Sequence, residues 1–308
     1  MQTIITILGP TAIGKSKLAI ELAKRFDGSI ISADSRQIYK NFDIGSGKIT
    51  VEEMQGIQHY MLDIRELWQD YNVAEFQKDV RQIIKELKDK KMLPFLVGGT
   101  GLYIESILYN YNLPSIAVNS SLRAELSKLN KVELQNKLLA LNPNHTLNHS
   151  DWNNPVRLIR SIEIAQSKTI PLISNQANSY NPLLIGLTTS LENIKKNITK
   201  RVDARLEQGA IEEVVNIKKI LANKLSPDLA FQKLAQFGLG TMTINQYLED
   251  KIDYEEMRKQ YIQAEYQYAR RQLTWFRRMN NINWFEADDQ NLIDKTSLLL
   301  ADFLKLQS

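Results

Sequence analysis

The stretch G-P-T-A-I-G-K-S at residues 9–16 lies between an apolar run, Ile4 to Leu8, and an amphipathic run, Leu18 to Phe26. Strand, glycine-bounded loop and helix in this order match the P-loop pattern G-x-x-x-x-G-K-[ST] in full. The loop N–H groups and the positive end of the following helix form a cradle for phosphate oxygens. We therefore predict phosphate binding by Gly9, Pro10, Thr11, Ala12, Ile13, Gly14, Lys15 and Ser16, with the Ser16 hydroxyl on Mg²⁺.

Length and composition limit the classes of protein to which this chain can belong. A chain of 308 residues can form one large domain with an elaboration, or two domains. The absence of cysteine excludes disulfides, thiolate zinc sites and cysteine nucleophiles. No apolar run approaches the roughly 18 residues that a membrane-spanning helix needs, and the chain enters a strand directly. We therefore expect a cytoplasmic protein without a membrane partner.

Two further strands are predicted to end at the same edge of the sheet as the P-loop. Ser29 to Ser32 is followed by Asp34-Ser35-Arg36-Gln37, and Leu93 to Val97 by Gly98-Gly99-Thr100. Ligands of open α/β sheets collect at the carboxyl ends of strands, so Asp34 should lie near the cradle. An N-cap or turn role for Asp34 stays open. The second strand lacks the acid with which P-loop hydrolases hold Mg²⁺, and this disfavours ordinary NTP hydrolysis.

The remaining pattern predicts an α/β fold, a P-loop NTPase-like parallel sheet flanked by helices, with an inserted all-helical domain. A loop from Tyr39 to Lys48, a strand from His59 to Ile64 and a helix capped by Asn72 precede the insertion. Residues 112–182 lack strand-like runs and show helical periodicity, so we predict the insertion there. The core domain then comprises residues 1–111 and 183–308 and ends in C-terminal helices.

Arginines recur outside the P-loop, in the predicted insertion, on the helix after the re-entering strand, and on the last long helix. That last helix, Tyr254 to Met279, carries arginines at 270, 271, 277 and 278 among aromatic residues, without acids nearby. Most such charges are solvated surface, but this group suits an anionic, base-bearing partner. The expected core stripe of the helix is Met257, Tyr261, Ala264, Tyr268 and Trp275.

The residues alone leave three functions open. They are a small-molecule kinase, a nucleic-acid-modifying transferase that uses the P-loop for a diphosphate leaving group, and a nucleotide-gated RNA-binding module without chemistry. The missing acid after Val97 argues against the kinase. The position of Asp34 beside the cradle argues against a module without chemistry.

Several motifs resemble the tRNA dimethylallyltransferase family. They are G-P-T-A-I-G-K-S at 9–16, I-S-A-D-S-R-Q-I-Y-K at 31–40, D-I-G-S-G-K at 43–48, L-V-G-G-T-G-L-Y at 96–103, R-L-I-R-S-I-E at 157–163 and A-R-R-Q-L-T-W-F-R-R at 269–278. One segment departs from the family, which usually has Ile/Val-Gly-Tyr and a basic residue where this chain has Leu239-Gly240-Thr241-Met242. The resemblance therefore assigns no role to Thr241 or Met242.

The resemblance implies transfer of a dimethylallyl group from dimethylallyl diphosphate to N6 of the adenosine on the 3′ side of the anticodon of a tRNA. Mg²⁺ is the implied cofactor, and we expect a monomer. Asp34 would act as the base, Thr100 would contact the reacting nucleotide or diphosphate, and Arg201 would stabilise the leaving diphosphate. The adenine would flip out of the anticodon loop to react. The implied tRNA contacts are Asp34, Ser35, Arg36, Gln37, Thr100, Arg123, Val156, Arg157, Leu158, Ile159, Arg160, Arg271 and Arg278.

Overall fold

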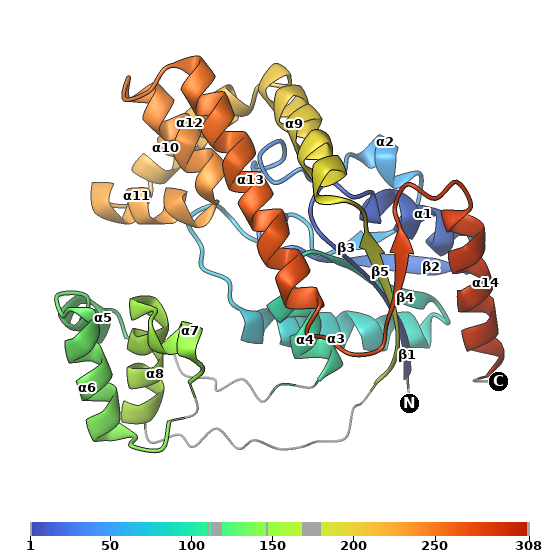
Figure 1. The fold of residues 1–308 in the computed structure, drawn as a ribbon, viewed down its shortest axis with the longest axis horizontal. Helices are drawn as coiled ribbons and strands as arrows, with labels where there is room; N and C mark the ends of the chain where they lie inside the picture. The colour runs from blue at the N-terminus through green and yellow to red at the C-terminus, as the bar shows by residue number, and fades with distance from the viewer. Residues whose placement is uncertain (1, 110, 112–118, 146, 168–179, 307–308) are drawn as a thin grey trace. The chain divides into compact units, whose positions relative to one another are not determined.

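A six-stranded parallel sheet organises the structure, a computed structural model that describes residues 2–109, 111, 119–145, 147–167 and 180–306 (Figure 1). The strand order is β3-β2-β4-β1-β5-β6, and every neighbouring pair among the described strands is parallel. The predicted parallel sheet flanked by helices is therefore confirmed. The strands are β1 (Gln2–Leu8), β2 (Gly28–Ala33), β3 (His59–Tyr60), β4 (Leu93–Gly98), β5 (Tyr180–Thr188) and β6 (Ile282–Glu286).

Both faces of the sheet are buried, which explains the continuous apolar runs of its central strands. Alternate residues of β1 point to opposite faces, with Ile4 and Leu8 in one core and Ile5 and Ile7 in the other. Helices α3 (Val73–Asp89) and α4 (Gly101–Leu108) cover the first face. Helices α1 (Lys15–Arg25) and α14 (Leu292–Lys305) cover the second. As predicted, Asn72 caps α3, and its side chain forms a capping box with Glu75.

A third hydrophobic core is built by the helices between β5 and β6 and by residues 38–42. These helices are α9 (Leu191–Glu207), α10 (Ala210–Ala222), α11 (Pro227–Gln236), α12 (Leu239–Leu248) and α13 (Tyr254–Phe276); α2 (Val51–Met54) lies in the preceding β2–β3 connection. The sequence pattern does not predict helices α10 to α12. In Figure 1, α9 and α13 lie side by side, and they bring their side chains to the end of the sheet where the P-loop lies.

The contacts divide the chain into two compact units. The large unit comprises Met1–Asn110 and Ala177–Ser308, and the small unit comprises Tyr111–Gln176. Described residues of the small unit form α5 (Ser120–Leu126), α6 (Lys131–Leu141), α7 (His149–Trp152) and α8 (Pro155–Gln166), without a strand. Leu126, Leu134, Leu138, Leu158 and Ile162 form its own core. The predicted domain boundaries at 112–182 stay a prediction.

Two expectations about elements are wrong. The strand predicted from His59 to Ile64 stops at Tyr60, since Met61 and Asp63 take positive φ angles of 65° and 55°. Helix α13 ends at Phe276, before the expected Met279. Its buried residues are Met257, Tyr261, Glu265, Ala269, Gln272, Leu273 and Phe276, whereas Ala264, Tyr268 and Trp275 are only partly buried. Among the described residues, no helix has the length and apolar character to cross a membrane.

Candidate active site at the carboxyl edge of the sheet

The predicted P-loop connects β1 to α1. Its backbone takes positive φ angles at Gly9 (150°), Ala12 (60°) and Gly14 (92°). A Cβ at Gly9 would lie 2.7 Å from the carbonyl oxygen of Leu187 in β5, so a side chain there would collide with the neighbouring strand. Lys15 Nζ donates a hydrogen bond to the Pro10 carbonyl at 2.6 Å and folds back over its own loop. The loop therefore has the tight form that a phosphate cradle needs.

The turns that follow β2 and β4 are hydrogen-bonded to each other. The Thr100 N–H donates to the Ala33 carbonyl at 3.2 Å, and the Ser35 N–H donates to Thr100 Oγ1 at 3.2 Å. The Asp34 carboxylate accepts the Arg36 N–H at 2.9 Å, which orients it within its turn. The turn that carries Asp34 therefore lies against Thr100, as the rule about the carboxyl ends of parallel strands predicts. The turn role considered for Asp34 is present as well, and it leaves the second carboxylate oxygen available.

Two cations of the site act on each other and on Asp34. Burial and the charge of Arg201 lower the pKa of Lys15 to about 7, against the opposing effect of Asp34. Burial and the charge of Arg205 lower the pKa of Arg201 to about 10, with Glu265 and Asp34 opposing. Arg201 also donates to Thr11 Oγ1 of the P-loop at 3.1 Å. The structure thus brings Lys15, Asp34 and Arg201 together, and an anion bound there would relieve the repulsion between the cations.

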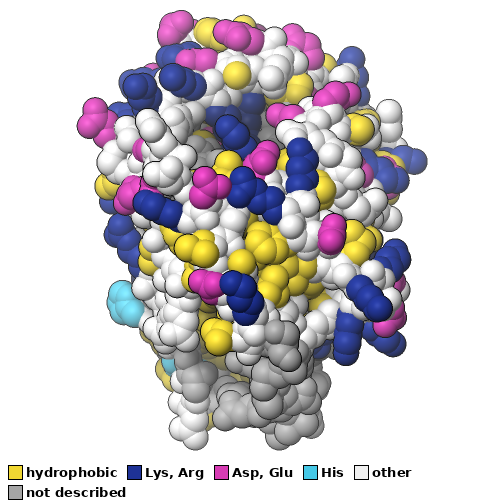
Figure 2. All heavy atoms as spheres, turned by 90° about the vertical axis from the view of Figure 1, so that its right-hand side faces the viewer, with side chains coloured by type: hydrophobic (Ala, Val, Ile, Leu, Met, Phe, Trp, Pro, Cys, Tyr) yellow, Lys and Arg dark blue, Asp and Glu magenta, His cyan; other side chains and the backbone are white. Residues whose placement is uncertain are grey.

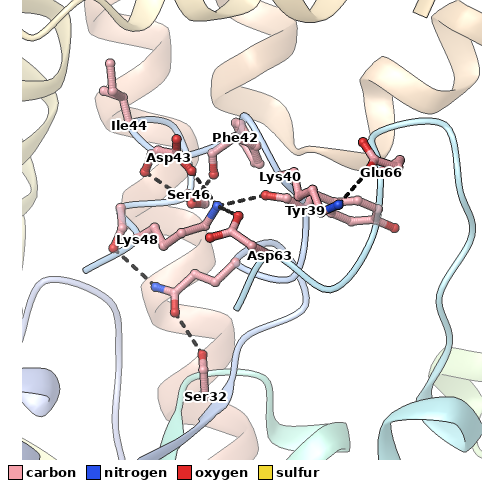
Figure 3. A network of polar contacts seen from close by, with 12 residues as sticks. Ser32, Tyr39, Lys40, Phe42, Asp43, Ile44, Ser46, Lys48, Asp63 and Glu66 are labelled. Carbon is pink, nitrogen blue, oxygen red and sulfur yellow. Dashed lines mark hydrogen bonds and ion pairs between the residues drawn. The ribbon is translucent and has the colours of Figure 1, made fainter. Parts of the chain in front are cut away.

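A chain of hydrogen bonds runs from β2 to the loop of residues 39–48 (Figure 3). Ser32 Oγ donates to Gln37 Oε1 at 2.8 Å, and Gln37 Nε2 donates to the Gly47 carbonyl at 3.2 Å. Gly47 has a φ of 61°, and a Cβ there would lie 1.8 Å from Arg201 Nη2. Only glycine therefore lets this loop lie against Arg201 in its present conformation.

The same loop is fastened at two further points. Lys48 Nζ donates to the Tyr39 carbonyl at 2.8 Å and to Asp63 at 2.6 Å, and it also pairs with Asp43 (Figure 3). From α10, the Glu213 carboxylate accepts the backbone N–H groups of residues 43, 44 and 45 at 2.7–2.8 Å. These bonds join segments about 170 residues apart in the sequence, so no local pattern could have predicted them.

Helix α13 contributes a buried carboxylate that the sequence analysis missed. Glu265 lies 3.4 Å from Arg205 Nη1 and 3.6 Å from Arg36 Nη1. The Arg36 guanidinium also lies over the Tyr268 ring, 5.0 Å from its centroid, and that of Arg271 lies 5.8 Å from the same centroid. The sequence signal for Glu265 is an acidic residue within the apolar stripe of a helix. A buried position of this kind accommodates a charged side chain only when that side chain is paired.

The predicted RNA contacts outside the turns of Asp34 and Thr100 fall into two groups. Arg270 and Arg271 on the last turns of α13, and Arg277 and Arg278 directly after it, are exposed, and none forms an ion pair within the described part of the chain. On the side of the molecule where α14 lies, by contrast, Lys and Arg alternate with Asp and Glu (Figure 2). The end of α13 is therefore the stronger candidate surface for a polyanion.

In the small unit the predicted arginines are bound to acids. Arg123 Nε and Nη2 donate to the Glu163 carboxylate, both at 2.8 Å, and Arg160 Nη1 donates to it at 3.1 Å. Arg157 pairs with Asp151. In the segment 156–160, Val156 is exposed and Ile159 partly buried, while the Leu158 side chain is buried in the core of the unit.

The residues present fit a phosphate-bound Mg²⁺. Within the described residues, no group of three or more His, Cys, Asp or Glu side chains could hold a metal ion. The Ser16 hydroxyl is exposed in the first turn of α1. Mg²⁺ keeps several waters and needs only one or two protein ligands beside phosphate oxygens. The donor set therefore suits a metal that arrives with its phosphate ligand.

Comparisons with known proteins agree with this geometry. A family model described as IPP transferase matches residues 37–279. Relatives named tRNA dimethylallyltransferase are 37% identical in Caldanaerobacter subterraneus subsp. tengcongensis, covering 98% of this chain and 97% of the relative, and 39% identical in Bacillus anthracis, covering 97% and 94%. The solved tRNA isopentenylpyrophosphate transferase of Bacillus halodurans is 33% identical, with a TM-score of 0.72 over 99% of this chain and 97% of that one. These matches do not favour the kinase alternative, and the chain belongs to the IPP transferase family of tRNA dimethylallyltransferases.

Proposed function

We propose that this chain transfers a dimethylallyl group from dimethylallyl diphosphate to N6 of the adenosine on the 3′ side of the anticodon in tRNAs. The observation that carries the proposal is that the turn of Asp34 is hydrogen-bonded to Thr100 beside the P-loop, through the Ser35 N–H and the Ala33 carbonyl, in a chain of this family. It supports a site in which a diphosphate and a base meet at one edge of the sheet.

Asp34 is the proposed base. The N6 amine attacks the allylic C1, the N–C bond forms, and the C1–O bond breaks with its electron pair passing to the diphosphate. An exocyclic amine is a weak nucleophile, so its proton must leave as the bond forms, and a carboxylate within hydrogen-bond reach accepts it. The contact of Thr100 Oγ1 with the Ser35 N–H supports a role for Thr100 at the nucleotide or diphosphate.

The leaving diphosphate gains negative charge, and the cations of the site are placed to stabilise it. Lys15 and Arg201 lie at the P-loop, and beside burial the charge of Arg201 lowers the pKa of Lys15 while the charge of Arg205 lowers that of Arg201. Developing charge on the diphosphate therefore meets fixed cations in a buried setting, where electrostatic stabilisation is strongest. Mg²⁺ held by Ser16 would supply further charge neutralisation on the diphosphate.

The proposal also names the partners and the location. tRNA binds through the residues implied by the resemblance, including the exposed Arg271 near the end of α13 and Arg278 just beyond it. Asp34, Ser35, Arg36 and Gln37 hold the reacting base. A tRNA substrate makes the cytoplasm the proposed location, and the monomer is kept as the proposed state.

The experiment is incubation with dimethylallyl diphosphate labelled in the allyl group and bulk tRNA, followed by mapping of the label. We expect label at N6 in the anticodon loop. Asp34→Asn should remove the transfer while tRNA affinity survives, because the amide keeps the shape of the carboxylate but accepts no proton.

Asp294→Asn is the matched control, because this acid lies on α14 in an exposed pair with Arg25. It should transfer at the wild-type rate. Wild-type turnover by the Asp34 variant would remove Asp34 as the base. Label transfer from the γ-phosphate of ATP to a small molecule, without transfer to tRNA, would instead support the kinase.

A further inference from the structure

One buried glutamine joins the P-loop to the turn after β4. Gln272, on α13, has only 5% of its surface exposed. Its Oε1 accepts the Thr11 N–H at 2.8 Å, and its Nε2 donates to the Gly99 carbonyl at 2.9 Å. A single amide therefore joins two loops that are separated by nearly ninety positions in the sequence and that follow the neighbouring strands β1 and β4 of the sheet.

The surrounding backbone is shaped to admit this amide. A Cβ at Gly99 would lie 2.1 Å from Gln272 Nε2, so a side chain there would displace the bridge. Two residues further along the chain, a Cβ at Gly101 would lie 2.4 Å from the ring of Trp275, which is also on α13. Helix α13 is thus pressed directly against the backbone of the turn at two adjacent points.

A polar side chain at this position has no packing advantage. Gln272 lies in the stripe of Ala269, Leu273 and Phe276, where an apolar residue would fill the same space. Burying an amide is unfavourable unless both its ends are hydrogen-bonded, and here both ends are. The glutamine therefore serves the geometry of the two loops that it joins.

Each of these loops carries one side of the proposed reaction. Thr11 belongs to the cradle, and its hydroxyl accepts from Arg201. Gly99 precedes Thr100, which contacts the Ser35 N–H in the turn of Asp34. The distance between the donor's diphosphate and the base on Asp34 thus depends on how these loops are held.

We propose that Gln272 is a positioning residue of the transfer reaction, because its amide fixes the P-loop relative to the turn of Thr100. This inference rests on the proposed function. Its prediction is specific: loss of the bridge should impair diphosphate binding and the chemical step together, beyond any loss of stability.

The test compares Gln272→Met with Gln77→Met. Gln77 is a matched control, because it is equally buried on α3 and donates to the Ser106 carbonyl at 2.6 Å, away from the cradle. Thermal unfolding, calorimetric binding of inorganic diphosphate and the single-turnover rate with saturating substrates are measured for both. Two neutral hydrogen bonds are lost at the site, so Gln272→Met should weaken diphosphate binding about 10-fold and slow the single turnover by about 10-fold or more. Gln77→Met should change neither by more than about twofold while lowering the unfolding temperature.

A second variant tests the donor half of the bridge. Gln272→Glu keeps an acceptor for the Thr11 N–H, but an ionised carboxylate cannot donate to the Gly99 carbonyl. A protonated carboxyl can do both. The ratio of the variant's single-turnover rate to that of the wild type should therefore rise as the pH falls, which a purely structural role does not predict.

The outcomes separate this inference from the proposed function. If the Gln272 variants match the Gln77 control in rate and diphosphate affinity, or the pH ratio is flat, the bridge is only structural. If the wild type binds diphosphate but transfers no prenyl group, the proposed function fails, and the effect of Gln272 on diphosphate binding is still decided. Should Gln272→Met not fold, Gln272→Asn, with its amide one methylene shorter, replaces it.

Discussion

Cations gather in both units of this protein, and the two units balance them differently. In the large unit, Lys15 and Arg201 form no ion pair within 4 Å among the described residues, and burial together with a neighbouring arginine, Arg201 for Lys15 and Arg205 for Arg201, lowers the pKa of each. In the small unit, Arg123 and Arg160 share the carboxylate of Glu163, and Arg157 pairs with Asp151.

The difference shows what each set of charges is prepared to do. Cations that lie together without an ion pair favour the binding of an external anion, because their repulsion is relieved when the anion arrives. Arginines already bound to acids must exchange those bonds for phosphate contacts, so their net gain from RNA is smaller. The number of cations in a unit therefore does not by itself predict how strongly the unit attracts an anion.

The largest expected effect comes from removing an unpaired cation. Arg201→Ala should lower kcat by about 10³-fold, the order found for arginines that stabilise transferring phosphoryl groups. Steady-state transfer to an anticodon stem-loop measures it. Arg157→Ala, which removes a paired cation from the small unit, should stay within a small factor of the wild type. Similar losses in both variants would erase the distinction between the units.

Removing the shared acid tests the paired set. Glu163→Gln should destabilise the small unit by about 2 kcal/mol, because two arginines lose their charged partner. Hydrogen exchange in residues 119–166 measures this. Glu125→Gln is the control in the same unit, since its exposed pair with Lys137 is screened by solvent and should contribute little to stability.

The ion pairs of Glu163 with Arg123 and Arg160 predict that the stability of the small unit depends on pH. Burial opposes ionisation of Glu163, but hydrogen bonds from Arg123 and Arg160 outweigh it and lower its pKa below 4.5. Since the pKa is lower in the folded than in the unfolded state, the stabilisation is present above pH 4.5 and is lost as the pH falls through the folded value. Glu163→Gln should therefore show a weaker loss of small-unit protection in acid than the wild type.

The lowered pKa of Lys15, about 7, predicts proton uptake when dimethylallyl diphosphate binds. An anion raises the pKa of the amine, so the affinity should fall by up to about 10-fold per pH unit as the pH rises above 7. Calorimetry in buffers of different ionisation enthalpy counts the protons. Lys15→Arg keeps its charge and should bind with a flat profile over this range; a flat wild-type profile would contradict the prediction.

The smallest expected effect concerns the exposed arginines. Replacing Arg271 and Arg278 by alanine should reduce the slope of log affinity for the stem-loop against log salt by about 1.5 to 2, because two phosphate contacts are lost. Replacing Arg123 and Arg160 together should reduce it by less, since Glu163 already neutralises part of their charge. An unchanged slope in the first variant would return Arg271 and Arg278 to ordinary surface charge.

Local patterns predicted much of the fold and the centre of the site. The strand–loop–helix at 9–16 and the cap at Asn72 depend on neighbouring residues, and both are present. The proximity of Asp34 and Thr100 followed from a rule about parallel strand ends. These features required no knowledge of distant contacts.

The rest depends on contacts that sequence spacing does not encode. Glu265 and Gln272 lie at core positions of α13, so an apolar pattern passes over them although both bind groups at the site. The pairing of Arg123 with Glu163 across two helices was equally hidden. A polar residue within the apolar stripe of a helix is the sequence signal that indicates such a contact.

The contact of Trp275 with Gly101 has a practical consequence. The indole ring of Trp275 lies against Gly101, the residue after Thr100. Its Nε1 is buried without a hydrogen-bond partner among the described residues. The protein thus carries a natural fluorophore beside the turn that the transfer reaction uses. Binding of a ligand at this turn can be followed by tryptophan fluorescence, without attaching a dye.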